Sequence, residues 1–343
     1  MAVIIPNQKK NILVLGGAGF IGSHLCEHLL HRGDNVVCLD NFVTSDVENI
    51  KMMLEFPNFE FIRHDITEDI DFVKEPGLRK FKVHVNGIQE IYNLACPTSA
   101  SSFTKLPVET ALANSLAVRV SLEMARKYKA RYLFASSSAV YGKAPEETNI
   151  IDEGYLGTVN FIGPRACYNE GKRFAETLIT TYRDHYKVEV RIARIFTTYG
   201  PRMLKESGRF IPDMISNALR NADMVIQGDV STGSSLCYVK DTVEGIVSLM
   251  QSELTTPVNL GNDNFMTYND IAEKIRTITG SMSSVTFTDA LPYTHQQSVP
   301  DITLAKEKLN WFPLVNIDDG LKQTIVYTRS SYVERRDIRS YTQ

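Results

Sequence analysis

Three residue types in two short segments could together oxidise an alcohol. Tyr168 and Lys172 stand four residues apart in CYNEGK (167–172), a spacing that places both side chains on one face of a helix. A phenol loses its proton at about pH 10, but a neighbouring ammonium group and a positively charged nicotinamide ring would both favour the phenolate. Tyr168 could therefore act as a general base near neutral pH. Ser137, in ASSSAVYG (135–142), supplies a hydroxyl that could orient the alcohol.

Each of these segments has a plainer interpretation when it is taken alone. A tyrosine and a lysine four residues apart also form surface pairs on amphipathic helices, and a run of serines can simply close a turn. The catalytic interpretation is favoured because both segments occur in one chain with a nucleotide-binding signature near its N-terminus.

That signature is GGAGFIG (16–22), which follows the apolar run NILVL (11–15) and opens a helical segment. Gly16, Gly19 and Gly22 permit a tight turn and let backbone N–H groups and the positive end of the helix approach a pyrophosphate. Glycine-rich turns are also common as purely structural features. The strand before the loop and the helix after it favour dinucleotide binding.

Asp40 ends the second apolar run, about 20 residues downstream of the loop, as a dinucleotide-binding unit requires. Its carboxylate could bind the adenosine ribose hydroxyls and repel the additional phosphate of NADP. Asn41 and Phe42 follow it, and no arginine stands there to receive that phosphate. The pattern predicts NAD as the cofactor.

Short β-branched runs alternate with amphipathic segments, which is typical of a doubly wound parallel sheet of the Rossmann type. The predicted strands are 11–15, 35–39, 59–62, 90–95, 131–136 and 188–196, and the predicted helices are Phe20–Arg32, about Val108–Tyr128, and Tyr168–Tyr186. After about Gly200 the alternation becomes irregular. We expect an NAD-binding domain over 1–200, with 235–260 returning to it, and a smaller α/β substrate lobe over 201–343.

Composition limits the partners. The chain has 343 residues, 43% of them hydrophobic, and a formal charge of −3, so it should bury a large core and offers no basic surface for nucleic acid. The five scattered cysteines predict reduced thiols in the cytosol, and no metal site is expected. MAVIIP, followed by two lysines, is too short for a signal peptide, and no run approaches the roughly 20 apolar residues of a membrane span.

The motifs together resemble the extended short-chain dehydrogenase/reductases, which include nucleotide-sugar epimerases, dehydratases and decarboxylases. The resemblance covers nearly the whole chain. Within it, NLACP (93–97), RACYNEGKR (165–173), VNLGN (258–262) and PDITLAKEKLNW (300–311) are most similar to UDP-glucuronate decarboxylases. Members of this family commonly form homodimers through two long helices, which we adopt as an expectation.

The resemblance also implies roles for individual residues. Asp65 and Ile66 would flank the adenine, and Asn114 would lie on the neighbouring helix. Besides the glycine loop, the residues expected to hold the cofactor are Phe20, Ile21, Asp40, Asn41, Asp65, Ile66, Asn93, Leu94, Ala95, Tyr168 and Lys172. The residues expected to bind the substrate are Pro97, Ser138, Arg165, Thr197, Arg202, Arg209 and Gln227.

Ala139 departs from the family pattern, which usually has glutamate at this position. Elimination of water from a 4-keto sugar needs a base at C5 and an acid for the departing hydroxyl, and a methyl group can be neither. A 4,6-dehydratase is therefore disfavoured. Decarboxylation remains possible, because oxidation at C4 turns a glucuronyl group into a β-keto acid that can lose CO₂. A 4-epimerase also remains possible, and in both reactions the hydride returns to the sugar.

A second departure concerns the nucleotide diphosphate. Ser234 stands where relatives usually have an arginine, and HQQSVPDI (295–302) has glutamines and serine where decarboxylases tend to have paired arginines. The loss of bidentate contacts should weaken diphosphate binding or change its geometry. This leaves the sugar and the base open.

The sequence thus predicts an NAD-dependent enzyme that modifies a nucleotide sugar, with UDP-glucuronate decarboxylation first. A 4-epimerase of a UDP-sugar or UDP-uronate is the alternative enzyme. The alternative from another class is an NAD-binding regulatory or scaffold protein without turnover.

Overall fold

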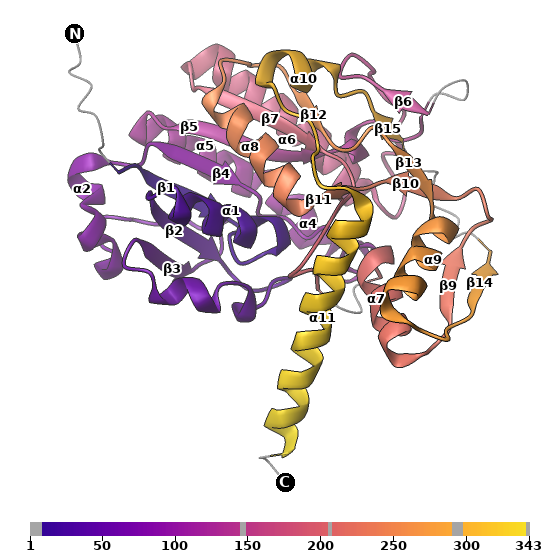
Figure 1. Ribbon diagram of the computed structural model, residues 1–343. Helices are drawn as coiled ribbons and strands as arrows, with labels where there is room; N and C mark the ends of the chain where they lie inside the picture. The colour runs from indigo at the N-terminus through magenta and orange to yellow at the C-terminus, as the bar shows by residue number, and fades with distance from the viewer. Residues whose placement is uncertain (1–8, 145–148, 205–207, 290–297, 341–343) are drawn as a thin grey trace.

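A computed structural model describes residues 9–144, 149–204, 208–289 and 298–340, with the side chains of 332–340 left out (Figure 1). Its centre is a sheet of seven parallel strands in the order β12-β7-β5-β4-β1-β2-β3. The strands are β1 (Asn11–Leu15), β2 (Asn35–Asp40), β3 (Phe59–Arg63), β4 (Glu90–Asn93), β5 (Arg131–Ser137), β7 (Val190–Ile195) and β12 (Val258–Leu260).

The order of these strands confirms the predicted doubly wound parallel sheet. From β1 the chain proceeds to β2 and β3 in one direction, and from β4 it proceeds to β5 and β7 in the other. The six predicted strands are all present, because their apolar runs can be buried on both faces of a parallel sheet. The reversal between β1 and β4 opens a crevice at the carboxyl ends of the strands, where ligands of such sheets bind.

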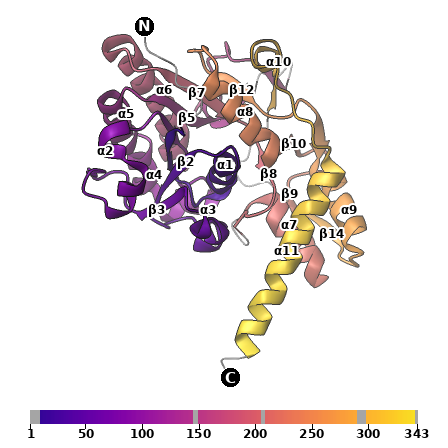
Figure 2. The same cartoon turned by 60° about the vertical axis from the view of Figure 1, so that its left-hand side comes forward.

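Helices cover both faces of the sheet (Figures 1 and 2). Ile12 and Val14 of β1 belong to a core with α1 (Phe20–His31) and α8 (Val239–Gln251). Leu13 and Leu15 belong to a second core that includes α5 (Leu116–Tyr128) and α6 (Ala166–Tyr186). The alternation of side chains along one strand therefore places a hydrophobic core on each side of the sheet.

The predicted helix over 108–128 is wrong in one respect, because the structure has two helices there. They are α4 (Pro107–Ala113) and α5, and the chain bends between them at Asn114 and Ser115. Asn114 Nδ2 donates hydrogen bonds to Thr110 O (2.8 Å) and to Cys96 Sγ (3.2 Å). The side chain of Asn114 thus competes with the continuing helix for backbone partners, which periodicity of apolar residues does not reveal.

A smaller group of elements lies beside the sheet, around α7 (Phe210–Arg220) and α9 (Tyr268–Thr279) (Figure 1). Outside the central sheet the strands form short pairs: β9 (Met224–Gln227) with β14 (Val285–Thr288), β10 (Gly233–Ser235) with β13 (Phe265–Thr267), β8 (Thr198–Tyr199) with β11 (Cys237–Tyr238), and β6 (Ile150–Ile151) with β15 (Val299–Pro300). Between them, α8 and β12 return to the central layers. The division into domains stays a prediction.

The remaining helices are α2 (Val83–Asn86), α3 (Ala100–Lys105), α10 (Thr303–Leu309) and α11 (Ile317–Ser340). Helix α11 projects from the body of the molecule in both views (Figures 1 and 2). None of the helices in the described part of the chain has the length and apolar character needed to cross a membrane.

Candidate active site

The glycine loop joins β1 to α1 in a conformation that requires glycine. Gly16 has φ +75° and donates its N–H to Leu39 O (2.8 Å). A Cβ atom there would lie 2.7 Å from the backbone nitrogen of Ala95, and one at Gly22 would lie 2.1 Å from Gly16 O. Gly19 caps α1 without a side-chain hydrogen bond, and Phe20 and Ile21 begin the helix. The first N–H groups of α1 are therefore directed toward space that a pyrophosphate could fill.

Asp40 lies directly under this loop. Its Oδ2 accepts a hydrogen bond from Ala18 N (3.0 Å), and its Oδ1 accepts from Phe42 N (2.9 Å) and Ser45 Oγ (2.7 Å). The carboxylate thus braces the loop and the turn after β2, where Phe42 has φ +61°. Its role toward the ribose stays a prediction.

The predicted adenine contacts lie at the same edge of the sheet. Asn41 Nδ2 donates to Asp65 Oδ2 (2.9 Å), and Thr67 donates to Asp65 Oδ1 through its N–H and its hydroxyl. Burial tends to raise the pKa of Asp65, but these hydrogen bonds outweigh it and lower that pKa. Ile66 is buried next to it. On the other side of the loop, Leu94 N donates to Leu15 O (2.9 Å).

The three proposed catalytic side chains meet where β5 ends and α6 begins. Lys172 Nζ donates a hydrogen bond of 2.7 Å to Ala135 O and lies 4.3 Å from the ring centroid of Phe134. Tyr168, one turn earlier on α6, is hydrogen-bonded to Ser137. The tertiary structure therefore brings the two segments together as the sequence predicts.

Burial dominates the acidity of this group. It raises the pKa of Tyr168 to about 12, helped by the nearby Cys96 thiol and opposed by the hydrogen bond from Ser137 and by the charges of Arg209 and Arg165. It also lowers the pKa of Lys172, which is only 3% exposed. Without further positive charge the phenol stays protonated at neutral pH. A cationic nicotinamide ring beside it would favour the phenolate.

The charges of two arginines, Arg165 and Arg209, act on Tyr168, and Phe103 of α3 lies between Tyr168 and Arg165. The Phe103 ring stacks on Tyr168 at a centroid distance of 4.7 Å, and the Arg165 guanidinium lies 5.4 Å from the Phe103 centroid. Arg165 Nε is buried with no hydrogen-bond partner among the described residues, and Arg209 Nη2 donates to Thr98 Oγ1, next to the buried Pro97. This arrangement can receive an anionic group. Sequence reasoning missed Phe103, since no spacing pattern marks it.

The other predicted substrate residues lie in different places. Arg202 pairs with Glu27 on α1 (Nη2–Oε2 2.7 Å), although its buried Nη1 has no partner in the part of the chain that the structure describes. Gln227 is exposed at the end of β9. Ser138 begins a single 3₁₀ turn at 138–140, in which Ala139 N donates to Ser137 Oγ (3.2 Å).

Ser234 is fully buried, and its hydroxyl is engaged within the protein. Its hydroxyl donates to Thr197 Oγ1 (3.0 Å) and Ser235 O (3.1 Å). The position at which relatives are expected to have arginine is therefore closed by a contact between two hydroxyls. The glutamines of the second departing segment lie outside the described residues.

The site passes a simple test of fit for a dinucleotide. A Cβ atom at Gly16 or Gly22 would clash with the backbone of Ala95 or of Gly16, so only glycine allows the close turn that dinucleotide-binding loops use. Two buried amide oxygens near Tyr168, Asn114 Oδ1 and Asn169 Oδ1, have no partner among the described residues. Buried polar atoms without partners are uncommon, and a bound ligand is one explanation for them.

The described residues give no comparable support for a bound metal ion. His24 and His28 have the i, i+4 spacing of a ligand pair on α1. His24 Nε2 instead contacts Pro201 O (3.0 Å), and His28 Nδ1 lies 3.5 Å from Glu244. In the described part of the chain, no three His, Cys, Asp or Glu side chains are arranged to hold an ion.

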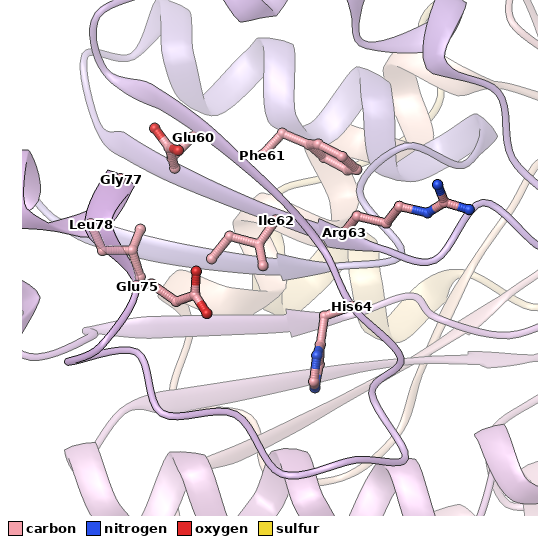
Figure 3. Close-up of a pocket in the computed structure, with 8 residues that line it drawn as sticks. All are labelled: Glu60, Phe61, Ile62, Arg63, His64, Glu75, Gly77 and Leu78. Atoms are coloured by element: carbon pink, nitrogen blue, oxygen red, sulfur yellow. The ribbon is translucent and has the colours of Figure 1, made fainter.

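A separate hollow of about 250 Å³ lies at the edge strand β3, bordered by Glu60, Ile62 and Gly77 (Figure 3). Arg63 and His64 also border it, just before Asp65. None of the residues proposed here for catalysis or binding lines this hollow, so it is not the candidate active site.

These features define an enzyme of the extended short-chain dehydrogenase/reductase class. They are the doubly wound sheet, the glycine loop and the close approach of Ser137, Tyr168 and Lys172. Residues 13–324 match the family model described as GDP-mannose 4,6 dehydratase. The chain belongs to this family.

The chain is similar to decarboxylases and to 4-epimerases of nucleotide sugars. UDP-glucuronic acid decarboxylase 1 of Arabidopsis thaliana is 39% identical over 94% of this chain and 70% of its own length, and the decarboxylase 1 of Danio rerio is 39% identical over 93% and 73%. Among solved structures, UDP-glucuronic acid 4-epimerase from Bacillus cereus with UDP-glucuronic acid and NAD is 27% identical, with a TM-score of 0.81 over 94% of this chain and 100% of that one. UDP-glucose 4-epimerase from Thermotoga maritima is 26% identical, with a TM-score of 0.82 over 94% and 99%.

Proposed function

We propose that this protein, an NAD-dependent enzyme that modifies nucleotide sugars, acts on UDP-glucuronate and converts it to a UDP-pentose with loss of CO₂. The observation that carries the proposal is the arrangement at the end of β5. There Tyr168 is hydrogen-bonded to Ser137, and Lys172 Nζ donates a hydrogen bond to Ala135 O. The identity of 39% with named decarboxylases over most of the chain supports the choice of reaction.

When it is bound, NAD accepts a hydride from the sugar and later returns it, so that no net redox occurs. Tyr168 removes the proton of the C4 hydroxyl, and Ser137 holds the C4 oxygen. Lys172 holds the nicotinamide ribose and adds positive charge beside the phenol. The resulting β-keto acid breaks its bond between C5 and the carboxylate. The electron pair of that bond is held as an enolate across C5 and C4, and a proton from solvent water then adds to C5. When C4 is reduced again, Tyr168 returns its own proton to the C4 oxygen.

The cofactor would lie across the crevice of the sheet. Gly16, Gly19 and Gly22, with Phe20 and Ile21, would receive the pyrophosphate at the N-terminus of α1. Asp40 and Asn41 would bind the adenosine ribose. The rest of the cofactor-binding site would be lined by Asp65, Ile66, Leu94 and Ala95.

A uronate is favoured because cations lie beside Tyr168. Among the described residues, the buried Nε of Arg165 has no hydrogen-bond partner, and Arg209 donates a hydrogen bond to Thr98. Both guanidinium groups can bind a carboxylate, and a charge-assisted hydrogen bond to it would offset the cost of their burial. Ser138, Pro97 and Thr197 would complete the sugar site, with Arg202 and Gln227 toward the nucleotide.

A 4-epimerase is the second candidate. The site needs only Ser137, Tyr168 and Lys172 for it, together with room for the 4-keto sugar to turn over. Ala139 permits both reactions, although it places a methyl group where a carboxylate could assist chemistry at C5, which decarboxylation needs and 4-epimerisation does not. The solved structure of the Bacillus cereus 4-epimerase with UDP-glucuronic acid supports this candidate.

We also infer a homodimer and a reducing, cytosolic compartment. Val108 and Leu112 of α4 and Phe174 of α6 are 64%, 40% and 52% exposed on two adjoining helices, which a second copy of the chain would cover in such a dimer. All five cysteines are free thiols.

The deciding experiment incubates the purified protein and NAD with UDP-glucuronate and follows the products by mass spectrometry and proton NMR. Loss of CO₂ to a UDP-pentose is the expected result. Unchanged mass with inversion at C4 would establish the epimerase instead, and no change in the sugar would reject UDP-glucuronate as the substrate.

A further inference from the structure

A buried ion pair lies directly behind the catalytic residues. Glu176 of α6 and Arg194 of β7 form two contacts, Nε–Oε1 at 3.1 Å and Nη2–Oε2 at 2.8 Å. Glu176 Oε1 also accepts a hydrogen bond of 2.6 Å from Ser136 Oγ. Glu176 is 9% exposed and Ser136 is 3% exposed. Both carboxylate oxygens are therefore engaged inside the protein.

Ser136 stands between the two residues of β5 that contact catalytic side chains. Before it, Ala135 O accepts the hydrogen bond from Lys172, and after it Ser137 is bonded to Tyr168. Glu176 lies four residues after Lys172 on the same face of α6. The Ser136–Glu176 bond thus joins the strand to the helix at the level of both catalytic contacts.

Arg194 extends this connection to the loop that follows β5. Its Nη1 donates to Tyr141 Oη (2.9 Å) and to Glu153 O (3.0 Å), and Tyr141 Oη donates to Asn259 Oδ1 of β12 (2.6 Å). One buried network therefore holds the carboxyl ends of β5, β7 and β12 against α6.

Stability alone is a weak reason for such a network. The cost of removing two charges from water largely cancels their attraction, so a well-packed apolar pair would serve folding as well. A fully bonded buried network does impose one geometry, because any shift leaves a charge without a partner. The network lies where a small shift of β5 relative to α6 would break both contacts, the one between Lys172 and Ala135 and the one between Tyr168 and Ser137.

We propose that Glu176 and Ser136 are positioning residues, which hold β5 and α6 in the register where Lys172 meets Ala135 and Tyr168 meets Ser137. The inference rests on the proposed function for the roles of Tyr168 and Lys172. It adds two residues that touch neither substrate nor cofactor.

The same geometry has an electrostatic consequence for Lys172. Burial lowers the pKa of its ammonium group, while the neighbouring Cys96 thiol and the Glu176 carboxylate oppose that effect. The Tyr168 ring is also close, with its centroid 5.8 Å from Nζ. Loss of the Glu176 charge should therefore lower the pKa of Lys172 further.

The test compares the full-length protein with Ser136→Ala, Ser136→Thr and Glu176→Gln, each saturated with NAD. The measurements are kcat and KM for UDP-glucuronate, the thermal midpoint, and the pH titration of Lys172 by ¹³C NMR of labelled lysine, assigned with Lys172→Met. We expect Ser136→Ala to lower kcat about 10- to 100-fold, as for a small misplacement of reacting groups, with little change in KM. Ser136→Thr keeps the hydroxyl and should therefore have a kcat near that of the wild type. In Glu176→Gln, Lys172 should titrate at a lower pH than in the wild type.

Thr324→Ala is the matched control, because Thr324 is also 3% exposed and its hydroxyl donates to Gly320 O (2.7 Å) on the remote helix α11. It should lower the thermal midpoint without changing kcat. Wild-type kcat in Ser136→Ala, or a wild-type Lys172 titration in Glu176→Gln, would overturn the inference. The NMR titration needs no turnover, so failure of the proposed substrate would be recognised separately.

Discussion

Phe103 and Tyr168 stack with their ring centroids 4.7 Å apart and their planes at 24°. Phe103 comes from α3 and Tyr168 from α6, and the contact closes one side of the candidate active site. The apolar ring removes water from the phenol, which is why burial is the largest cause of its raised pKa. The proposed base is therefore protonated until a cation or the substrate complex changes its surroundings.

Tyr168→Phe should lower turnover of UDP-glucuronate by about 100- to 10,000-fold, the usual contribution of a general base. The ring and its stacking on Phe103 are kept, so NAD should still bind. Fluorescence titration of the bound cofactor checks binding, and product analysis checks turnover. Full turnover in this variant would rule out the proposed role of Tyr168.

Gly22→Ala should abolish NAD binding or prevent the loop from forming, because its Cβ would lie 2.1 Å from Gly16 O. Calorimetric titration with NAD measures the effect. Gly280→Asn is a suitable control, since the added Cβ would meet no atom within 4 Å and asparagine tolerates the φ of +68°. Wild-type affinity of Gly22→Ala for NAD would contradict the proposed position of the pyrophosphate.

Ala139→Glu should increase the rate of CO₂ release. The carboxylate would follow Ser138 at the end of β5, in a 3₁₀ turn that is only partly buried, and could assist proton transfer at C5. Release of ¹⁴CO₂ from carboxyl-labelled UDP-glucuronate measures this rate, with Ala139→Gln as the uncharged control. Equal rates in both variants would show that a carboxylate here does not assist the reaction.

Stability should fall as pH falls from about 6.5 to about 4, in part because of His24. Burial, and then the charge of Arg202, lower the pKa of His24 to about 4, so the unfolded chain binds a proton in this range that the folded chain does not. The loss should be about 1 to 3 kcal/mol. Urea unfolding at several pH values measures it, and His24→Gln should lose this part of the pH dependence. An unchanged pH profile in the variant would exclude His24 as the cause.

Phe174→Glu should convert a dimer into a monomer, because a charge would replace an apolar side chain that is 52% exposed on α6. Light scattering coupled to size exclusion gives the mass of each species. Phe161→Glu, which changes an exposed residue outside the helices, is the control and should leave the mass unchanged. A monomeric wild-type protein would disprove the expected dimer.

Local patterns were sufficient for the sheet and for the positions of the main motifs. Continuous apolar runs can be buried only between two layers, so they predicted the six strands, and glycines at 16, 19 and 22 predicted the turn before α1. The predicted single helix over 108–128 failed at Asn114, because its side chain takes the backbone acceptor Thr110 O and also contacts Cys96 on a different segment, which apolar periodicity does not encode.

The sequence by itself determined the class of chemistry, since Tyr168 and Lys172 are kept on one helix face by their spacing, and Ser137 is kept at a strand end by the apolar run before it. Only the tertiary structure decided what surrounds them. Phe103 and Arg209 reach Tyr168 from remote segments, Glu176 meets Ser136 and Arg194 across two strands, and Ser234 is turned inward onto Thr197. These contacts join residues far apart in the chain, and their geometry depends on how whole layers pack, which no local spacing encodes.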